Sequence, residues 1–148
     1  MKLDSTYFHA IQLKKIQMIS LNCNYNERNE ESIKMSEIEL DIDNGGIVTS
    51  RNKGICYLKV SVGFGNKQDE PFNIQVIYKG YCECLKDVEK KDFEFYLKIQ
   101  SIPMLWAYAR ETINNNITKM GLPPIVLPAI NINEIIGEIT KKEGMEEE

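Results

Sequence analysis

Residues 105–113 read Leu105-Trp106-Ala107-Tyr108-Ala109-Arg110-Glu111-Thr112-Ile113, and the fold assignment depends on this stretch. Apolar residues in and around it recur at steps of three and four, which is the period of an amphipathic helix. Pro103 suits the first turn of such a helix, and Gly121 follows its last apolar residue, where a C-terminal cap is expected. The pattern therefore predicts one long helix over residues 103–120.

Upstream of this helix, four segments show the alternation of half-buried β-strands, in which side chains point to opposite faces with a period of two. Short polar stretches separate most of these segments, which favours an antiparallel sheet with one face on a core and the other toward solvent. The four segments are residues 7–25, 38–42, 57–64 and 72–78.

Three local features refine this prediction. The first segment changes parity between Leu13 and Ile16, which one extra residue at a β-bulge would explain. The run Asp43-Asn44-Gly45-Gly46 is typical of a tight turn or loop. Asp92 is expected to cap a short helix before the long one, with a break at residues 100–103.

Downstream of the long helix, residues 122–128 read Leu-Pro-Pro-Ile-Val-Leu-Pro, which is unusually apolar for a connection. Its three prolines exclude a helix and stiffen the chain. Asn131 or Asn133 then opens a short helix. Residues 141–148 are charged and are expected to be disordered, so that residues 1–140 form a single domain.

Composition narrows the function. The 148 residues are 43% hydrophobic and 27% charged, as in a soluble globular domain, and the formal net charge of −4 argues against a general nucleic-acid binder. No apolar run approaches the roughly 20 residues that span a bilayer. The first residues lack the apolar core of a signal peptide. We therefore expect a cytoplasmic protein that does not insert into membranes.

Reactive side chains are few. Cys82 and Cys84 form a Cys-x-Cys pair, but no second pair lies near enough in the sequence to complete a zinc site, and packing is the favoured role of the cysteines. The single histidine, His9, has no nucleophile motif around it. Sequence motifs of nucleotide-binding and hydrolytic enzymes are absent. We expect neither catalytic residues nor a metal or cofactor, although a thiol enzyme built on Cys82 and Cys84 remains a distant alternative.

The helix segment and the apolar connection together resemble the SecB family of export chaperones, over roughly residues 7–140. The resemblance is carried by Trp106, by Tyr108-Ala109-Arg110-Glu111, and by Gly121, Pro124, Pro128 and Asn131. It implies an α+β fold, with a four-stranded antiparallel Greek-key sheet and a long and a short C-terminal helix. It also implies an eight-stranded dimer, and a dimer of such dimers packed through their long helices.

The resemblance also implies a groove for unfolded polypeptide between the last helix and a crossover that leaves the fourth strand. The stiff apolar connection supports such a groove independently, since its side chains would be displayed at low entropic cost. Gly80 is expected at a sharp bend of the crossover. The expected groove residues are Val76, Tyr78, Tyr81, Cys82, Leu122, Ile125, Leu127, Ile132, Ile135, Ile136 and Ile139.

The long helix is expected to mediate assembly as well. Apolar and aromatic residues surround much of its circumference, and one sheet face could not cover them all, so a partner helix is expected. The expected interface residues of this homo-oligomer are Leu105, Trp106, Tyr108, Ala109 and Ile113.

Two functions follow from the resemblance. One is an ATP-independent holdase for unfolded proteins or preproteins, with the motor ATPase SecA as partner; the other is a chaperone or adaptor dedicated to one partner, such as the antitoxin of a toxin–antitoxin system. Asp69 and Glu70 are the expected SecA contacts. Met18 and Asn22 stand where export chaperones tend to have acidic residues, so we expect weak or absent SecA binding.

Overall fold

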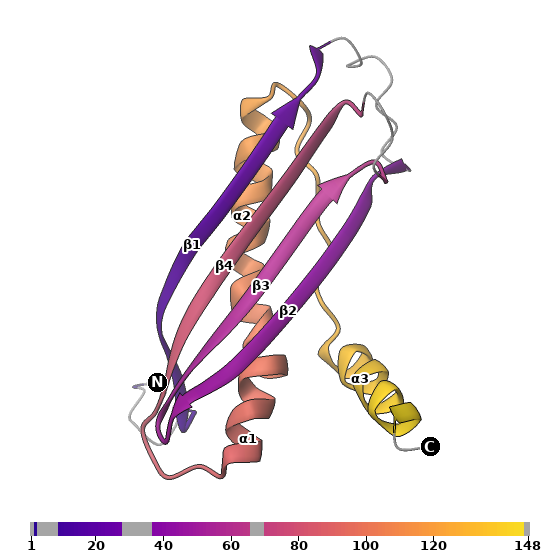
Figure 1. The fold of residues 1–148 in the computed structure, drawn as a ribbon. Helices are drawn as coiled ribbons and strands as arrows, with labels where there is room; N and C mark the ends of the chain where they lie inside the picture. The colour runs from indigo at the N-terminus through magenta and orange to yellow at the C-terminus, as the bar shows by residue number, and fades with distance from the viewer. Residues whose placement is uncertain (1, 3–8, 28–36, 66–69, 147–148) are drawn as a thin grey trace.

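The computed structural model describes residue 2 and residues 9–27, 37–65 and 70–146. A four-stranded sheet is covered on one face by helices, while a last helix lies to its side (Figure 1). The α+β fold predicted from the sequence is confirmed. In chain order the elements are β1 (Ile11–Tyr25), β2 (Glu39–Ser50), β3 (Lys53–Gly63), β4 (Phe72–Cys84), α1 (Lys90–Phe95), the π-helix η4 (Tyr96–Gln100), α2 (Ile102–Lys119) and α3 (Ile132–Glu146).

The strands lie in the order β1-β4-β3-β2, and every neighbouring pair is antiparallel. Consecutive strands β2, β3 and β4 are adjacent, whereas β1 reaches β2 by a long connection and lies beside β4. This is the predicted Greek-key connectivity. The order leaves β1 and β2 as the two edges of the sheet.

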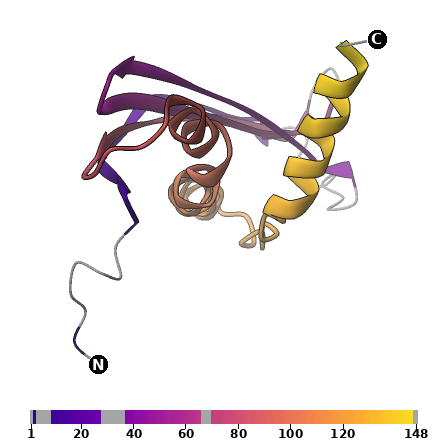
Figure 2. The ribbon, with the colours of Figure 1, turned by 90° about the horizontal axis from the view of Figure 1, so that it is seen from below.

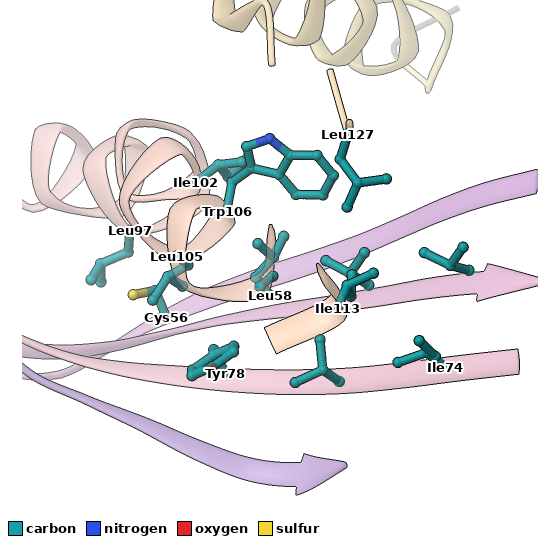
Figure 3. Packing of buried hydrophobic residues seen from close by; sticks show 14 of the residues in the cluster. Cys56, Leu58, Ile74, Tyr78, Leu97, Ile102, Leu105, Trp106, Ile113 and Leu127 are labelled. Atoms are coloured by element: carbon teal, nitrogen blue, oxygen red, sulfur yellow. The ribbon is translucent and has the colours of Figure 1, made fainter. Parts of the chain in front are cut away.

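The alternation of β3 and β4 determines which face of the sheet is covered. Their apolar positions point toward α2, and seen from below, α1 and α2 lie on that side of the sheet (Figure 2). The other face of the sheet, called the outer face here, is covered by none of the described helices. Full burial of a large aliphatic or aromatic side chain contributes about 1.5–3 kcal/mol, so the covered face supplies most of the stability. Its buried residues include Cys56, Leu58, Val60, Val62, Phe72, Ile74, Val76 and Tyr78, packed against Leu105, Ala109, Ile113 and Ile117 of α2 (Figure 3).

Strand β1 contains two irregularities where the sequence predicts one. The pairing with β4 shifts between Leu13 and Lys15, at the predicted place, and shifts again between Met18 and Ser20. The apolar residues change parity a second time at this place, from Ile16 and Met18 to Leu21 and Cys23, and the prediction of a single bulge overlooked this change.

This second shift separates two residues that the SecA prediction takes together. Met18 pairs with Tyr78 on the covered face, while Asn22 pairs with Gln75 on the outer face. The expectation that both lie on one docking face is therefore wrong, because the extra residue between them reverses the parity of the strand.

The predicted turn at Asp43–Gly46 is also wrong, because β2 continues through both glycines. A Cβ at Gly46 would lie 2.6 Å from the Cβ of Leu97, and the Asn44 amide donates a 2.6 Å hydrogen bond to the Lys98 carbonyl. The glycine thus serves the close approach of η4 to the sheet rather than a turn. The chain turns instead at residues 51–52.

The predicted break before α2 is replaced by helical backbone. Ser101 adopts right-handed helical angles, its N–H donates to the Tyr96 carbonyl at 3.0 Å, and its hydroxyl donates to the Leu97 carbonyl at 2.8 Å. α1 begins after Glu89 with no side-chain cap, so the capping role predicted for Asp92 is wrong.

The ends of α2 and α3 follow the sequence more closely. Pro103 lies in the first turn of α2, and Gly121 has a φ of +77°, the left-handed conformation of a C-terminal cap. The Asn133 N–H donates to the Asn131 side chain at 3.1 Å, so Asn131 is the residue that opens α3. The helix continues to Glu146, beyond the predicted boundary at residue 140, because lysine and glutamate are good helix formers.

Candidate polypeptide-binding site

Trp106 attaches the apolar connection to α2. Its indole N–H donates a 2.9 Å hydrogen bond to the Pro128 carbonyl, and its side chain is almost fully buried. Leu127 lies close to the indole ring (Figure 3). The connection, residues 121–131, is therefore fixed along α2 as it returns toward the start of α3 (Figure 1).

The connection alternates like a strand, although it pairs with none. Ile125 and Leu127 are buried, with 7% and 4% of their surfaces exposed, whereas Val126 between them is 88% exposed. Two of the predicted groove residues thus point into the protomer. They hold the connection in place, and the surface that a polypeptide could contact lies on its other side.

The groove residues that were predicted on a crossover after the fourth strand lie on that strand itself. Val76, Tyr78 and Cys82 lie on the covered face, where α2 buries them. Tyr81 points to the outer face, since neighbouring residues of a strand alternate. The expectation that Tyr78, Tyr81 and Cys82 form the floor of an open groove is wrong, because these residues belong to β4 and not to a crossover.

The sharp bend predicted at Gly80 is also wrong, because Gly80 lies within β4. A Cβ there would lie 2.6 Å from the Cys56 sulfur and 2.7 Å from Cδ1 of Leu13, so the glycine makes room for side chains of the neighbouring strands. The actual crossover is the short connection from Leu85 to Glu89.

Side chains from the connection and α3 remain partly open and form a surface called the apolar strip here. The connection that carries part of the strip runs beside α2 to the start of α3 (Figure 1). Val126 and Ile130 were missed by the sequence prediction, although the same apolar pattern includes them. The side chain of Ile139 lies outside the described residues. The strip consists of Leu122, Val126, Ile130, Ile132, Ile135 and Ile136, of which only Val126 is fully exposed.

The edge strand β2 adds apolar surface on the covered face. Leu40 is half-buried and Ile42 is 37% exposed, because α2 packs over β3 and β4 and leaves this edge largely uncovered. Their alternation with Glu39 and Asp41 is visible in the sequence. The pattern does not reveal, however, that α2 leaves Leu40 and Ile42 uncovered.

Four of the five residues predicted to form the oligomer interface on α2 are buried within the protomer instead. Leu105, Ala109 and Ile113 are buried against the sheet, and Trp106 is buried beneath the connection, so one protomer covers them. The expectation that a sheet face cannot cover this circumference overlooked the returning connection, which supplies a second covering layer.

Tyr108 alone of the five is open, with 46% of its surface exposed. Its ring lies 5.9 Å from that of Tyr78, whose hydroxyl shares a hydrogen bond with the Thr112 hydroxyl. Met104, one turn earlier on α2, is 36% exposed. Met104 and Tyr108 therefore form an exposed apolar flank on α2, on a side of the helix that the connection does not cover.

Of the two predicted SecA contacts, Asp69 lies outside the described residues. The Glu70 carboxylate accepts hydrogen bonds from the Phe64 N–H at 3.0 Å and from the Asn73 amide at 2.7 Å. Glu70 therefore closes the connection between β3 and β4 within the protomer.

The buried thiols pack as the sequence predicts. The sulfurs of Cys56 and Cys82 lie 3.9 Å apart on neighbouring strands, and the Cys56 sulfur is 3.7 Å from the Gly80 carbonyl oxygen. The hydrogen bond between the two thiols lowers the pKa of Cys56 to about 7 and raises that of Cys82. Across the described residues, no three His, Cys, Asp or Glu side chains are grouped so as to hold a metal ion. Among the described helices, none combines the length and hydropathy that a membrane span requires.

Comparison with known proteins agrees with this fold. Residues 8–142 match the family described as preprotein translocase subunit SecB. An uncharacterized protein of Methanocaldococcus jannaschii is 28% identical over 66% of this chain and 64% of its own length, so the match spans less than two thirds of that relative. The protein-export protein SecB of Methylobacillus flagellatus is 21% identical over 87% of this chain and 83% of its own.

A solved structure shows the same fold. It is that of the Mycobacterium tuberculosis Rv1957 SecB-like chaperone in complex with a ChAD peptide from the Rv1956 HigA1 antitoxin. It superposes with a TM-score of 0.64 and 12% identity, over 82% of this chain and 88% of that one. The family match extends over residues 8–142, which is nearly the whole length, and this chain therefore belongs to the SecB family.

Proposed function

We propose that this protein is an ATP-independent holdase chaperone of the cytoplasm that binds unfolded or partly folded polypeptide along the apolar strip. The observation that carries the proposal is the strip itself. Buried anchors, Trp106 and Leu127, hold an extended apolar segment whose outward side chains stay partly exposed. Such a surface favours apolar side chains of a client without demanding a particular sequence, because burial of apolar area is non-directional.

The length of the strip supports an extended client. It runs beside α2, which has 18 residues and hence a length of about 27 Å at a rise of roughly 1.5 Å per residue. A strand-like client segment rises about 3.3 Å per residue, so about eight residues would cover that distance. Each partly exposed isoleucine of the strip then adds a modest amount to the binding free energy. The total stays low enough for the client to dissociate.

Replacement of Ile135 and Ile136 by serine tests the strip. We expect the Kd for a fluorescently labelled, permanently unfolded protein to rise at least about tenfold, since each lost apolar contact weakens binding and about 1.4 kcal/mol corresponds to tenfold. A matched control replaces Ile19 and Ile47, exposed by 47% and 59% on the edge strands, by serine. The client would bind elsewhere if the affinity fell equally in both double variants. The same would follow if the Ile135 and Ile136 variant kept its affinity.

A chaperone dedicated to one partner, such as an antitoxin, is the second candidate. The similar SecB-like chaperone solved with an antitoxin peptide favours it, although the likeness at 12% identity shows the fold alone. Competition separates the two functions. Displacement of a labelled client by several unrelated unfolded proteins supports the holdase, whereas displacement by a single partner supports the dedicated chaperone.

We also propose a homo-oligomer, a dimer of dimers. The exposed flank of α2 at Met104 and Tyr108, together with Met18 and Leu21 on the edge strand β1, offers apolar surface outside the strip. Light scattering at micromolar concentration should give about four times the chain mass of 17.1 kDa. A persistent monomer would contradict this assembly.

We also propose that the protein can deliver preproteins to SecA, but that its affinity for SecA is low. Glu70 is engaged within the protomer, and Asn22 supplies no charge on the outer face. Titration with SecA at low and moderate salt is the test. Tight binding that weakens with salt, and that is lost when Asp69 and Glu70 are both replaced by alanine, would instead assign a dedicated export role.

A further inference from the structure

The outer face of the sheet is divided into two halves of opposite charge. Strand pairing places Asp43 opposite Lys59 at the boundary between them. The acidic half lies on β2, with Glu39, Asp41 and Asp43 at alternate positions of that strand. The basic half lies on β1, β3 and β4 and carries Lys15, Lys53, Lys59 and Lys79, with Glu83 as the acidic residue of this part of β4.

Two tyrosines organise the basic half. The ammonium of Lys79 lies 4.7 Å from the ring centre of Tyr81 and 5.6 Å from that of Tyr57. The ammonium of Lys15 lies 5.4 Å from the Tyr81 ring on its own side of the sheet, and the Tyr81 hydroxyl donates to Gln17 at 3.4 Å. The contact with Tyr81 raises the pKa of Lys79 above its usual range.

These contacts do not provide the lysines with a carboxylate acceptor. A tyrosine ring attracts an ammonium group through its π face but does not replace a carboxylate as an acceptor of all three N–H donors. Within the described part of the chain, none of the four lysines forms an ion pair with a carboxylate. Aromatic rings therefore hold the charges of Lys15 and Lys79 in place, and these charges remain available to a ligand.

A hollow of about 510 Å³ adjoins these side chains, between the start of β1 and the hairpin of β2 and β3. Aliphatic and aromatic surface from Ile55 and Tyr81 lines it, and its charged lining is mainly basic, with Lys14, Lys15 and Lys53 against the single carboxylate of Glu83. Ligand sites typically combine an apolar lining with a few positioned polar groups, as this hollow does.

We propose that the basic half of the outer face binds a short acidic peptide segment of a partner protein. Carboxylates of the segment would accept hydrogen bonds from Lys15 and Lys79, and an apolar side chain between them would pack against Tyr57 and Tyr81. This site lies on the opposite side of the sheet from the apolar strip. Partner and client could therefore be bound together, and the site does not depend on the holdase function.

Charge decides between an acidic peptide and a nucleic acid. Glu39, Asp41 and Asp43 end the positive region within the same face and would repel a long polyanion that extends past Lys59. The net charge of −4 of the whole chain also opposes nucleic-acid binding, which needs many phosphate contacts. A short acidic segment uses the lysines without reaching the acidic half.

The test measures the anisotropy of a fluorescein-labelled peptide in which aspartates and glutamates surround one tyrosine. We expect saturable binding at low salt that weakens markedly toward physiological salt. The variant with Lys15→Gln and Lys79→Gln should bind at least about tenfold more weakly. The control with Lys91→Gln and Lys98→Gln removes the same charge from exposed residues of α1 and η4, and its affinity should change less than about twofold.

Several results would overturn the proposal. They are the absence of saturable binding, equal losses in the two double variants, and tighter binding of a single-stranded oligonucleotide than of the peptide. A drop in oligomeric mass on replacing Lys15 and Lys79 would assign this face to a second copy and also overturn it. Should that variant fail to fold, Lys53→Gln with Lys59→Gln probes the same half by the same criteria.

Discussion

Two apolar segments follow one another along the chain, and they relate to the core in opposite ways. In the connection, Ile125 and Leu127 are buried against α2, whereas in α3 the isoleucines Ile132, Ile135 and Ile136 are only half-buried. The connection lies in contact with a long helix and is fastened by the Trp106 hydrogen bond. α3 has η4 as its main neighbour and lies beside the sheet (Figure 2). Segments of similar hydrophobicity are therefore buried in one case and partly exposed in the other.

The largest effect should come from the buried side of the connection. Leu127→Ala removes a side chain that is 4% exposed, so we expect the free energy of unfolding in urea to fall by about 2–5 kcal/mol. Val126→Ala, at a side chain that is 88% exposed, should change it by less than about 0.5 kcal/mol. Similar losses in both variants would show that the connection has no inner and outer side.

A smaller loss is expected where η4, the main neighbour of α3, meets the sheet. Gly46→Ala places a methyl group 2.6 Å from the Leu97 Cβ, and overpacking of this kind costs about 1–3 kcal/mol. Gly45→Ala meets nothing within 4 Å and serves as the matched control. Thermal unfolding of the two variants measures the difference. A Gly46 variant as stable as the control would mean that η4 is not held closely against β2.

The smallest of the three effects concerns the hydrogen bond that fastens the connection. Trp106→Phe keeps an aromatic ring in place but removes the N–H that donates to the Pro128 carbonyl. We expect a loss of about 1 kcal/mol in urea unfolding, the usual net contribution of one such bond, because water can reach the exposed Pro128. If the variant loses as much stability as Leu127→Ala, ring packing rather than this bond holds the connection.

Much of the fold could be predicted because its signals are local. The alternation of β3, the period of α2, the cap at Gly121 and the opening of α3 at Asn131 or Asn133 are each encoded within a few residues and agree with the structure, which selects Asn131. The failures share a different property. Gly46 has the sequence signature of a turn, yet its role depends on Leu97, which is 51 positions away.

The candidate site was less predictable than the fold for the same reason. Leu105, Trp106 and Ile113 are apolar whether a partner protomer, the sheet or the connection covers them, and only the packing shows which. Val76, Tyr78 and Tyr81 share one strand, but alternation sends Tyr81 to the outer face, where it meets Lys15 and Lys79. Tyr81 could be assigned to the outer face only once β4 was known to extend to Cys84.

The amino-acid sequence by itself determined the α+β class, the long helix with its caps, the apolar connection and the family, because these depend on periodicity and on motifs within short windows. Only the tertiary structure decided which apolar side chains are covered and which stay open. It also decided which lysines gather over tyrosines on the outer face. Burial is a property of pairs of segments far apart in the chain, and hydrophobicity alone does not specify the partner.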